Sequence, residues 1–245
     1  MCGRYAQTAD MRELMEQFEV TGTSPQSSLP LNWNIAPTNP IYIVRANDRS
    51  GKDVNSEKAL ATVSWGLIGP WLTDMQEARA SQSRAINARS ESIHEKPTFR
   101  NAFRSTRCLI PASGYYEWAT ALGQYRPKQP FYISARDGMA LPIAGIWSSW
   151  TAPNGEVIET ASIITQEAQG ELESIHSRMP VFMPPDRWDL WLNPRNTDVN
   201  ELKSLMVVEH PESIVIARPV SDAVNSVANN GKELTVETPL GEPET

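Results

Sequence analysis

The pattern of hydrophobic and polar residues predicts a chain that contains both strands and helices. Stretches that alternate between apolar and polar residues, or stay apolar between turn residues, are typical of strands. They cover residues 2–7, 41–45, 59–67, 107–111, 114–118, 131–135, 141–147, 157–165 and 214–220. Apolar residues at helical spacing cover residues 10–18, 184–192 and 198–208. Because strands and helices do not alternate regularly, we expect an α+β fold: a largely antiparallel, barrel-like bent β-sheet flanked by helices.

Capping signals and turn residues mark the ends of these elements. Asp10 and Asp198 each stand three residues before a glutamate, as in a capping box at the start of a helix. Asp137-Gly138 forms a turn between two predicted strands, whereas Gly69-Pro70-Trp71 breaks the pattern and opens a long loop. A short helix is expected over residues 166–174.

Length and composition indicate a single globular unit. The chain has 245 residues, of which 40% are hydrophobic and 21% charged, and no break demands two domains. We expect one domain over residues 2–233 and a disordered tail over residues 234–245, which are acidic and contain proline. The sequence contains no apolar run of spanning length and no signal segment at its start, so we expect a cytoplasmic protein.

The charge and the cysteine content narrow the function classes. The net charge of −7 has the wrong sign for binding nucleic acid by bulk electrostatics, although a local arginine cluster can still hold a few phosphates. Two cysteines in a reducing compartment favour separate thiols over a disulfide. Cys108 lies in an apolar run and is interpreted as a small buried hydrophobe.

The first residues, Met1-Cys2-Gly3-Arg4, carry the sharpest chemical signal. Removal of Met1 would leave an N-terminal cysteine, which offers an α-amine and a thiol on adjacent carbons. An aldehyde can form an imine with the amine and then be closed by the thiol into a thiazolidine; alternatively, the thiol can attack an amide. A cysteine that stands at this position by chance, in an ordinary strand, is the third interpretation. In that strand, Arg4 would share a face with Cys2.

Other candidate residues each admit a plain interpretation. Glu117, between two aromatic residues, is either a carboxyl with a raised pKa or an outward-facing strand residue. Trp71 is either a packing residue or a platform for unpaired bases. His176 stands two residues before Arg178 at a helix-to-strand junction and could hold a substrate group and its phosphate. The basic run is predicted to be a solvated helix face: Lys96, Arg100, Arg104 and Arg107.

Two further features come from spacing. Residues 84–91 alternate, so Asn87 and Arg89 share a face if this stretch is extended. No metal-ligand spacing and no glycine-rich phosphate loop occurs, so we expect neither a metal nor another cofactor.

Taken together, the motifs resemble those of the SRAP family, the SOS-response-associated peptidases or abasic-site processing proteins. They occur in the family's order and span the chain from residue 2 to about residue 233. The motifs are Met1-Cys2-Gly3-Arg4-Tyr5, Trp33-Asn34-Ile35-Ala36-Pro37-Thr38, Trp65-Gly66-Leu67, Ile86-Asn87-Ala88-Arg89-Ser90-Glu91, Arg107-Cys108-Leu109-Ile110-Pro111-Ala112, Gly114-Tyr115-Tyr116-Glu117-Trp118 and Ile175-His176-Ser177-Arg178-Met179-Pro180.

The resemblance implies a function and a role for each motif residue. It implies a monomeric sensor of abasic sites in single-stranded DNA, associated with the nucleoid when bound, that cross-links to the lesion as a thiazolidine through Cys2. In the catalytic group it implies that Asn87 positions the terminus, that Glu117 acts as acid and base, and that His176 contacts the opened sugar. It further implies phosphate contacts by Arg4, Arg89 and Arg178, a DNA path past Asn34 and Trp71, and a position near the site for Thr165.

Two alternatives belong to other classes. The first is an amidohydrolase with an N-terminal cysteine nucleophile; a related possibility is a literal peptidase activity that removes Met1 or resolves the cross-link. The second is a DNA-damage binding module in which Cys2 only packs. Ser177, Met179 and Arg218 depart from the family pattern and put the peripheral DNA contacts in doubt, leaving the central residues untouched.

Overall fold

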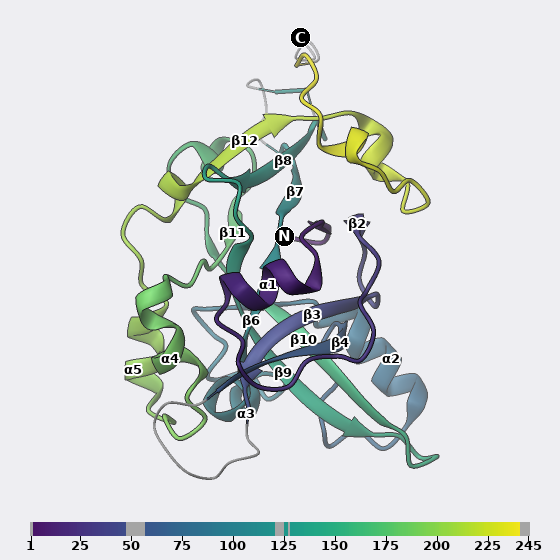
Figure 1. The fold of residues 1–245 in the computed structure, drawn as a ribbon, viewed down its shortest axis with the longest axis vertical. Coiled ribbons are helices and arrows are strands. Elements are labelled where there is room, and N and C mark those ends of the chain that lie inside the picture. The colour runs from purple at the N-terminus through teal and green to yellow at the C-terminus, as the bar shows by residue number, and fades with distance from the viewer. Residues whose placement is uncertain (1, 48–56, 121–124, 127, 241–245) are drawn as a thin grey trace.

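A computed structural model describes residues 2–47, 57–120, 125–126 and 128–240, and its centre is a closed β-barrel (Figure 1). The barrel strands are β3 (Pro40–Ala46), β4 (Lys58–Trp65), β6 (Arg107–Ala112), β9 (Leu141–Thr151) and β10 (Val157–Glu167). Neighbours pair antiparallel in the order β4, β3, β6, β9, β10. The ring closes where β10 pairs parallel with β4, at Thr160 opposite Ser64 and Ala161 opposite Trp65.

The barrel strands carry buried apolar residues on both of their faces over much of their length. Alternate residues such as Ile41, Ile43 and Ile163 belong to one core cluster, which also contains Cys2. The residues between them, such as Val44 and Ile164, belong to a second cluster built with the helices. The two-residue period of a strand assigns each side chain to one cluster or the other.

A second sheet lies beside the barrel and contains five strands, all antiparallel. Their order is β12 (Val215–Pro219), β8 (Pro130–Ala135), β7 (Gly114–Trp118), β1 (Tyr5–Gln7) and β2 (Asn32–Ile35). The chain passes from the barrel to this sheet at Ser113 and returns across the turn at Asp137-Gly138. The strands on either side of these two turns therefore do not pair with each other, and the Asp137-Gly138 turn does not close a hairpin.

The carboxyl half of β10 gathers two short strands that carry predicted site residues. Beyond residue 163, β11 (Arg178–Pro180) takes the place of β9 and pairs antiparallel with residues 165–167. On the other side, β5 (Asn87–Arg89) pairs parallel with residues 163–165. Thr165 consequently lies between Arg89 and Pro180 in the sheet, which brings residues far apart in the sequence to one end of β10.

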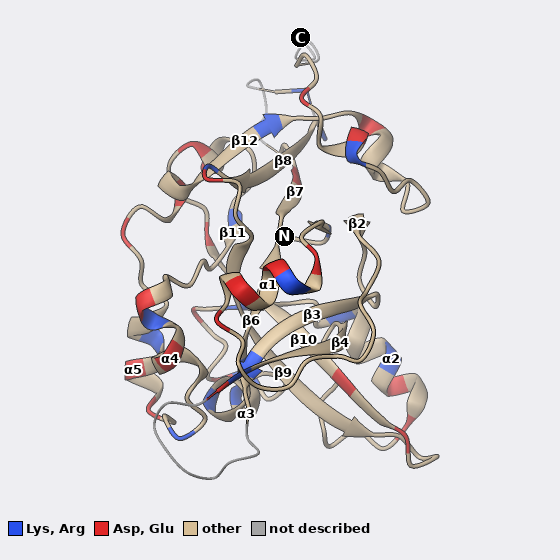
Figure 2. Ribbon diagram, in the orientation of Figure 1, with Lys and Arg blue, Asp and Glu red and all other residues tan. Residues whose placement is uncertain are grey.

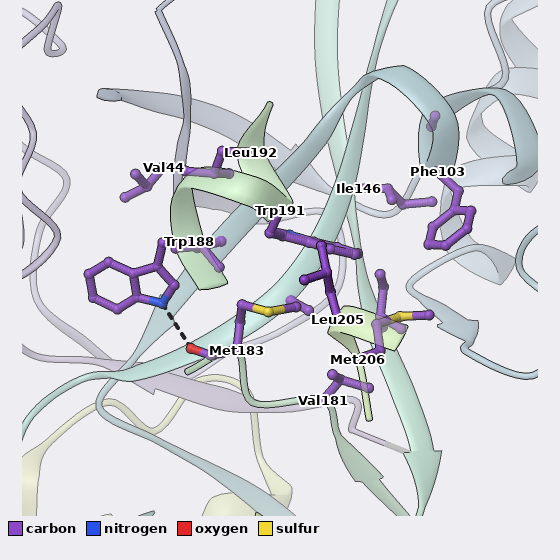
Figure 3. Close-up of a cluster of buried hydrophobic side chains, with 14 of the residues drawn as sticks. Val44, Phe103, Ile146, Val181, Met183, Trp188, Trp191, Leu192, Leu205 and Met206 are labelled. Carbon is purple, nitrogen blue, oxygen red and sulfur yellow. Dashed lines mark hydrogen bonds between the residues drawn. The ribbon is translucent and has the colours of Figure 1, made fainter. Parts of the chain in front are cut away.

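Short helices surround the barrel (Figure 1). They are α1 (Met11–Gln17), α2 (Met75–Arg84), α3 (Arg100–Ser105), α4 (Trp188–Leu192) and α5 (Val199–Leu205). The capping box predicted at Asp10 is present, with both reciprocal hydrogen bonds formed. Figure 3 shows α4 and α5 packing apolar side chains against the barrel, with the indole nitrogen of Trp188 donating to the Met183 carbonyl at 2.8 Å. Among the described residues, no helix has both the length and the apolar character that a membrane crossing requires.

The α+β fold with a barrel-like, largely antiparallel sheet is confirmed, but some elements differ from the sequence expectation. Helix α2 lies where a loop was expected, because only Ala78 of its residues is buried and no apolar stripe marks it. The helix expected over residues 166–174 is reduced to the 3₁₀ helix η1 (Gly170–Ser174), because β10 extends to Glu167. Further 3₁₀ turns are η2 (Pro185–Arg187), η3 (Pro211–Ile214), η4 (Asp222–Asn225) and η5 (Lys232–Thr235).

The end of the described chain also differs from the disordered tail expected after residue 233. Leu234 in η5 is buried, with 1% of its surface exposed. The Thr238 amide donates to the Pro219 carbonyl at 2.9 Å, which ties this segment to β12. Residues 241–245 of the predicted tail lie outside the described residues.

Candidate active site

Cys2 lies in the core, three residues before β1 begins at Tyr5. Its side chain is fully buried in the cluster that contains Tyr5, Trp65 and Tyr115. The side-chain amide of Asn87 donates a hydrogen bond of 2.8 Å to the Cys2 carbonyl oxygen. Burial raises the pKa of the Cys2 thiol, and the nearby Glu117 charge raises it further. The thiol is therefore protonated at neutral pH, in a position that Asn87 fixes from β5.

Glu117 projects from β7 into the same region, and 3% of its surface is exposed. Burial penalises the charged carboxylate and raises the pKa of Glu117 to about 7. Of the two interpretations that the sequence left open, the structure selects the buried carboxyl with a raised pKa. At neutral pH, this group is present in comparable amounts as acid and as base, which suits it to proton transfer in both directions.

His176 faces Glu117 from the turn between η1 and β11. Its Nε2 lies 3.9 Å from Oε2 of Glu117, and its Nδ1 accepts a hydrogen bond of 3.0 Å from the Arg178 amide. Nδ1 also lies 3.3 Å from the Arg178 carbonyl oxygen. The shorter contact, with the Arg178 amide, favours an acceptor Nδ1 and, in the neutral ring, a proton on Nε2, the nitrogen nearest the carboxyl. Burial lowers the pKa of His176, which favours this neutral form.

A groove of about 780 Å³ opens beside these residues. Its lining residues are Arg89, Glu167, Ala168, Glu173, His176, Ser177 and Arg178. Arg89 is exposed there, whereas Arg178 forms a bidentate ion pair with Glu91, with Nη1 at 2.8 Å and Nη2 at 3.0 Å from the two carboxylate oxygens. Thr165 is fully buried, and its carbonyl accepts a third bond from Arg178 at 2.8 Å.

Arg4 and Asn34 form a separate polar network with the C-terminal segment. Nη1 of Arg4 donates to the Asn34 side-chain oxygen at 2.8 Å and to the Val224 carbonyl at 3.0 Å. The Asn34 amide in turn donates to the Ser226 and Asn229 carbonyls, both at 2.9 Å. Here Asn34 is buried and holds the asparagine-rich turn onto β2. The DNA contacts expected of Arg4 and Asn34 remain predictions.

Trp71 lies apart from this cluster, in the turn before α2. It is 49% exposed and lines a different groove, of about 820 Å³, together with Arg84 and Phe99. That groove shares no lining residue with the one beside His176. An exposed indole that shares a groove with an arginine suits the stacking of unpaired bases. The place of Trp71 in the DNA path also stays a prediction.

Sequence reasoning missed two charged residues. Glu91 was not recognised as the partner of Arg178, although the two-residue alternation would place it on the same face as Asn87 and Arg89. Arg107 was assigned to a solvated helix face but is 2% exposed, because it begins β6 and its guanidinium turns into the core. The strand predicted over residues 107–111 was the local signal that could have separated Arg107 from the exposed Arg100 and Arg104.

Positions of Lys and Arg are interspersed with positions of Asp and Glu along the ribbon in Figure 2. Within the described part of the chain, no group of three or more His, Cys, Asp or Glu residues could hold a metal ion. The side chains gathered at this site offer a thiol, a carboxyl, an imidazole and two arginines.

Comparisons with known proteins identify the family of this chain. Residues 1–227 match the family described as SOS response associated peptidase (SRAP). The abasic site processing protein YoqW of Bacillus subtilis is 35% identical over 234 residues, which covers 96% of this chain and 98% of that protein. The abasic site processing protein HMCES of Mus musculus is 29% identical over 236 residues, 86% of this chain and 62% of that one. A crystal structure from Bacteroides thetaiotaomicron has a TM-score of 0.82 at 25% identity and covers 97% of this chain and 100% of its own. The resemblance found in the sequence is thus confirmed, and the chain belongs to the SRAP family.

Proposed function

We propose that this protein, after loss of Met1, captures the aldehyde of an abasic site in single-stranded DNA as a thiazolidine on Cys2. The observation that carries the proposal is the convergence of Asn87, Glu117 and His176 on Cys2 from different parts of the fold. Relatives named abasic site processing proteins support the same class of substrate.

The chemistry balances without a cofactor. Hydrolysis of the Met1–Cys2 bond consumes one water and frees the Cys2 amine. The amine adds to the C1′ aldehyde of the ring-opened sugar and gives a carbinolamine, which loses water to become an imine. The thiol sulfur then bonds to the imine carbon, and its proton passes to the nitrogen. Capture of the aldehyde therefore releases one water and leaves a five-membered ring.

Each neighbouring group has a task in this sequence. In its protonated form, His176 can pass the Nε2 proton to the ring oxygen of the closed sugar as the bond from C1′ to that oxygen breaks. The imidazole then takes up the proton of the C1′ hydroxyl, which leaves the aldehyde. Glu117, with a pKa of about 7, can then protonate the departing hydroxyl of the carbinolamine. Asn87 holds the Cys2 backbone by its carbonyl, so that amine and thiol are presented to one carbon.

The route through the imine suits the environment of the thiol better than amide hydrolysis does. A cysteine hydrolase attacks as a thiolate, whereas burial raises the pKa of Cys2 and keeps its sulfur protonated. In thiazolidine formation the amine attacks first, and the thiol adds to an imine that is already activated. The peptidase chemistry in the family's name is therefore the second candidate, restricted to removal of Met1 or release of the cross-link.

Phosphate binding at this site has to be local, because the net charge is −7. Arg89 and Arg178 line the groove beside His176 and would hold the phosphates that flank the lesion. We keep Arg4 as a third phosphate contact in this proposal, together with the DNA path past Asn34 and Trp71.

Intact-mass spectrometry of the protein mixed with an abasic single-stranded oligonucleotide tests the proposal. The expected product has the mass of the chain without Met1 plus the oligonucleotide minus one water. Cys2→Ala should abolish this stable adduct while an imine, trapped by borohydride, persists on its α-amine. Cys108→Ala removes the other thiol and should leave the adduct unchanged. A stable adduct on Cys2→Ala, formed without borohydride, would overturn the proposal.

The same spectra address the peptidase candidate. If Cys2 itself removes Met1, the Cys2→Ala chain keeps Met1 under conditions in which the unmodified chain loses it. Equal loss of Met1 from both chains assigns the removal to another enzyme.

A further inference from the structure

The guanidinium of Arg178 is already occupied by a carboxylate. Its two terminal nitrogens face the two oxygens of Glu91 at 2.8 and 3.0 Å, the fork-to-fork geometry in which arginine also binds a phosphate. A phosphate and the Glu91 carboxylate cannot both take this position on the fork. An anion that binds the Nη1 and Nη2 edge of Arg178 must therefore first displace Glu91.

The two partners are held unequally. The Arg178 side chain is 11% exposed, and its Nη2 also donates to the Thr165 carbonyl at 2.8 Å. The Glu91 side chain is 48% exposed, and the Arg178 pair is the one ion pair that it forms among the described residues. Besides Arg178, backbone hydrogen bonds from Glu91 itself and from Glu167 hold this carboxylate. Displacement would thus turn Glu91 toward water and leave Arg178 in place.

The connection to the site is short. The Ser90 amide donates to the Thr165 carbonyl at 2.8 Å, the same oxygen that Arg178 uses. The Arg178 backbone amide also holds Nδ1 of His176. The ion pair is therefore built onto the strand that carries Asn87 and onto the turn that carries His176.

We propose that Glu91 is a built-in competitor for the DNA phosphate at Arg178, which keeps the guanidinium ordered and weakens binding of strands that offer no other contact. This inference rests on the proposed function. It adds a source of selectivity for strands that carry a lesion. An intact strand binds more weakly because the ion pair between Glu91 and Arg178 must first be broken, whereas a strand with a lesion is held covalently through Cys2 in spite of that free-energy cost. The occupant of the fork is a phosphodiester of single-stranded DNA, because the groove beside Arg178 also holds Arg89 and His176.

Fluorescence anisotropy with an intact single-stranded oligonucleotide tests this role. Glu91→Gln should tighten binding roughly three- to five-fold, the range of one partly exposed ion pair. Glu173→Gln removes the same formal charge from an exposed residue of the same groove and should have a clearly smaller effect. Glu91→Asp keeps the charge but shortens the reach to Arg178, and it should also tighten binding.

Repeating the comparison in a chain that lacks the Arg178 guanidinium shows whether the effect of Glu91 acts through this arginine. In an Arg178→Gln chain, Glu91→Gln and Glu173→Gln should change the affinity equally, because no guanidinium is released. Equal effects in the native background, or weaker binding by both Glu91 variants when their melting curves match the parent, would overturn the proposal. The mass assay separates this from the larger question: adduct formation by the unmodified chain tests the proposed function, and it does not depend on Glu91.

Discussion

At the scale of single residues, Glu117 combines a structural cost with a chemical use. Its carboxyl is nearly removed from solvent, and burial raises its pKa from the ordinary value of 4.5 to about 7. Between these two pH values the folded protein holds a proton that the unfolded chain has already released. Stability must therefore fall as the pH rises through this window, and it stays reduced above it.

Glu117→Gln should remove this pH dependence, since the amide keeps the shape and cannot ionise. Above pH 7 the variant should be more stable than the parent by roughly 3 kcal/mol, and near pH 4 the difference should vanish. Urea unfolding at several pH values measures this. A constant difference across the series would contradict the assignment of the raised pKa.

The same variant should slow adduct formation. Loss of a positioned acid and base costs on the order of 10² in rate or more, while non-covalent affinity for the strand should not change. Quenched time points analysed by intact mass give the rate. A rate equal to that of the parent would remove Glu117 from the mechanism.

At the scale of elements, Arg107 joins the ends of two helices to the barrel. Its guanidinium donates to the Phe103 carbonyl in α3 at 2.8 Å and to the Trp191 carbonyl in α4 at 2.6 Å. It also donates to the Asn193 carbonyl and, at 3.0 Å, to the Asn196 carbonyl beyond α4. Carbonyls at the C-terminal ends of helices lack hydrogen-bond donors within the helix. The buried guanidinium of Arg107 supplies these donors to both α3 and α4. Burial lowers the pKa of Arg107 to about 10, which leaves it charged at neutral pH.

Arg107→Leu should therefore destabilise the protein by about 3 kcal/mol or more, because buried carbonyls lose their donor. Arg104→Leu makes the same substitution at an exposed position of the adjacent helix and should stay within about 0.5 kcal/mol. Denaturant unfolding of both variants checks the contrast. Similar losses would show that the guanidinium bonds contribute little.

At the scale of the whole molecule, contacts of aromatic side chains and of the C-terminal segment help to join the second sheet to the rest of the fold. The Tyr5 ring in β1 meets the Trp65 ring of the barrel edge-on, with centroids 5.2 Å apart, and the Trp65 indole donates to the Ile86 carbonyl just before β5. The C-terminal segment forms another junction. Asn225 and Asn230 accept hydrogen bonds from the Trp118 indole and the Trp33 amide, at 2.7 and 2.8 Å. The site lies where the barrel, β5 and this sheet meet.

The C-terminal junction predicts a difference between two neighbouring residues. Leu234→Ala should cost about 2–4 kcal/mol, because the side chain is buried and its loss leaves a cavity. Val236→Ala, at a position that is 57% exposed, should change stability by less than about 0.5 kcal/mol. Thermal unfolding of the pair is the measurement. An unaffected Leu234→Ala chain would restore the expectation of a tail that begins at this residue.

What the sequence determined by itself was local. The two-residue and helical periods located the strands and the capped helices, because side-chain direction repeats within each element. The N-terminal cysteine and the family motifs named Asn87, Glu117 and His176, which the fold brings together with Cys2. Helix α2 was not predicted from the sequence, because it buries a single alanine and has no apolar stripe.

Tertiary structure alone decided the rest, because pairing and burial depend on residues distant in the sequence. It placed β6 and β7 in different sheets, and likewise β8 and β9. Each of these strands pairs with strands distant in the sequence and is buried against them, and does not pair with its neighbour across the turn. It buried Glu117 and thereby set its pKa, and it placed Arg107 in the core. It also paired the guanidinium of Arg178 with the carboxylate of Glu91, because β10 brings β5 and β11 to the same end of the barrel.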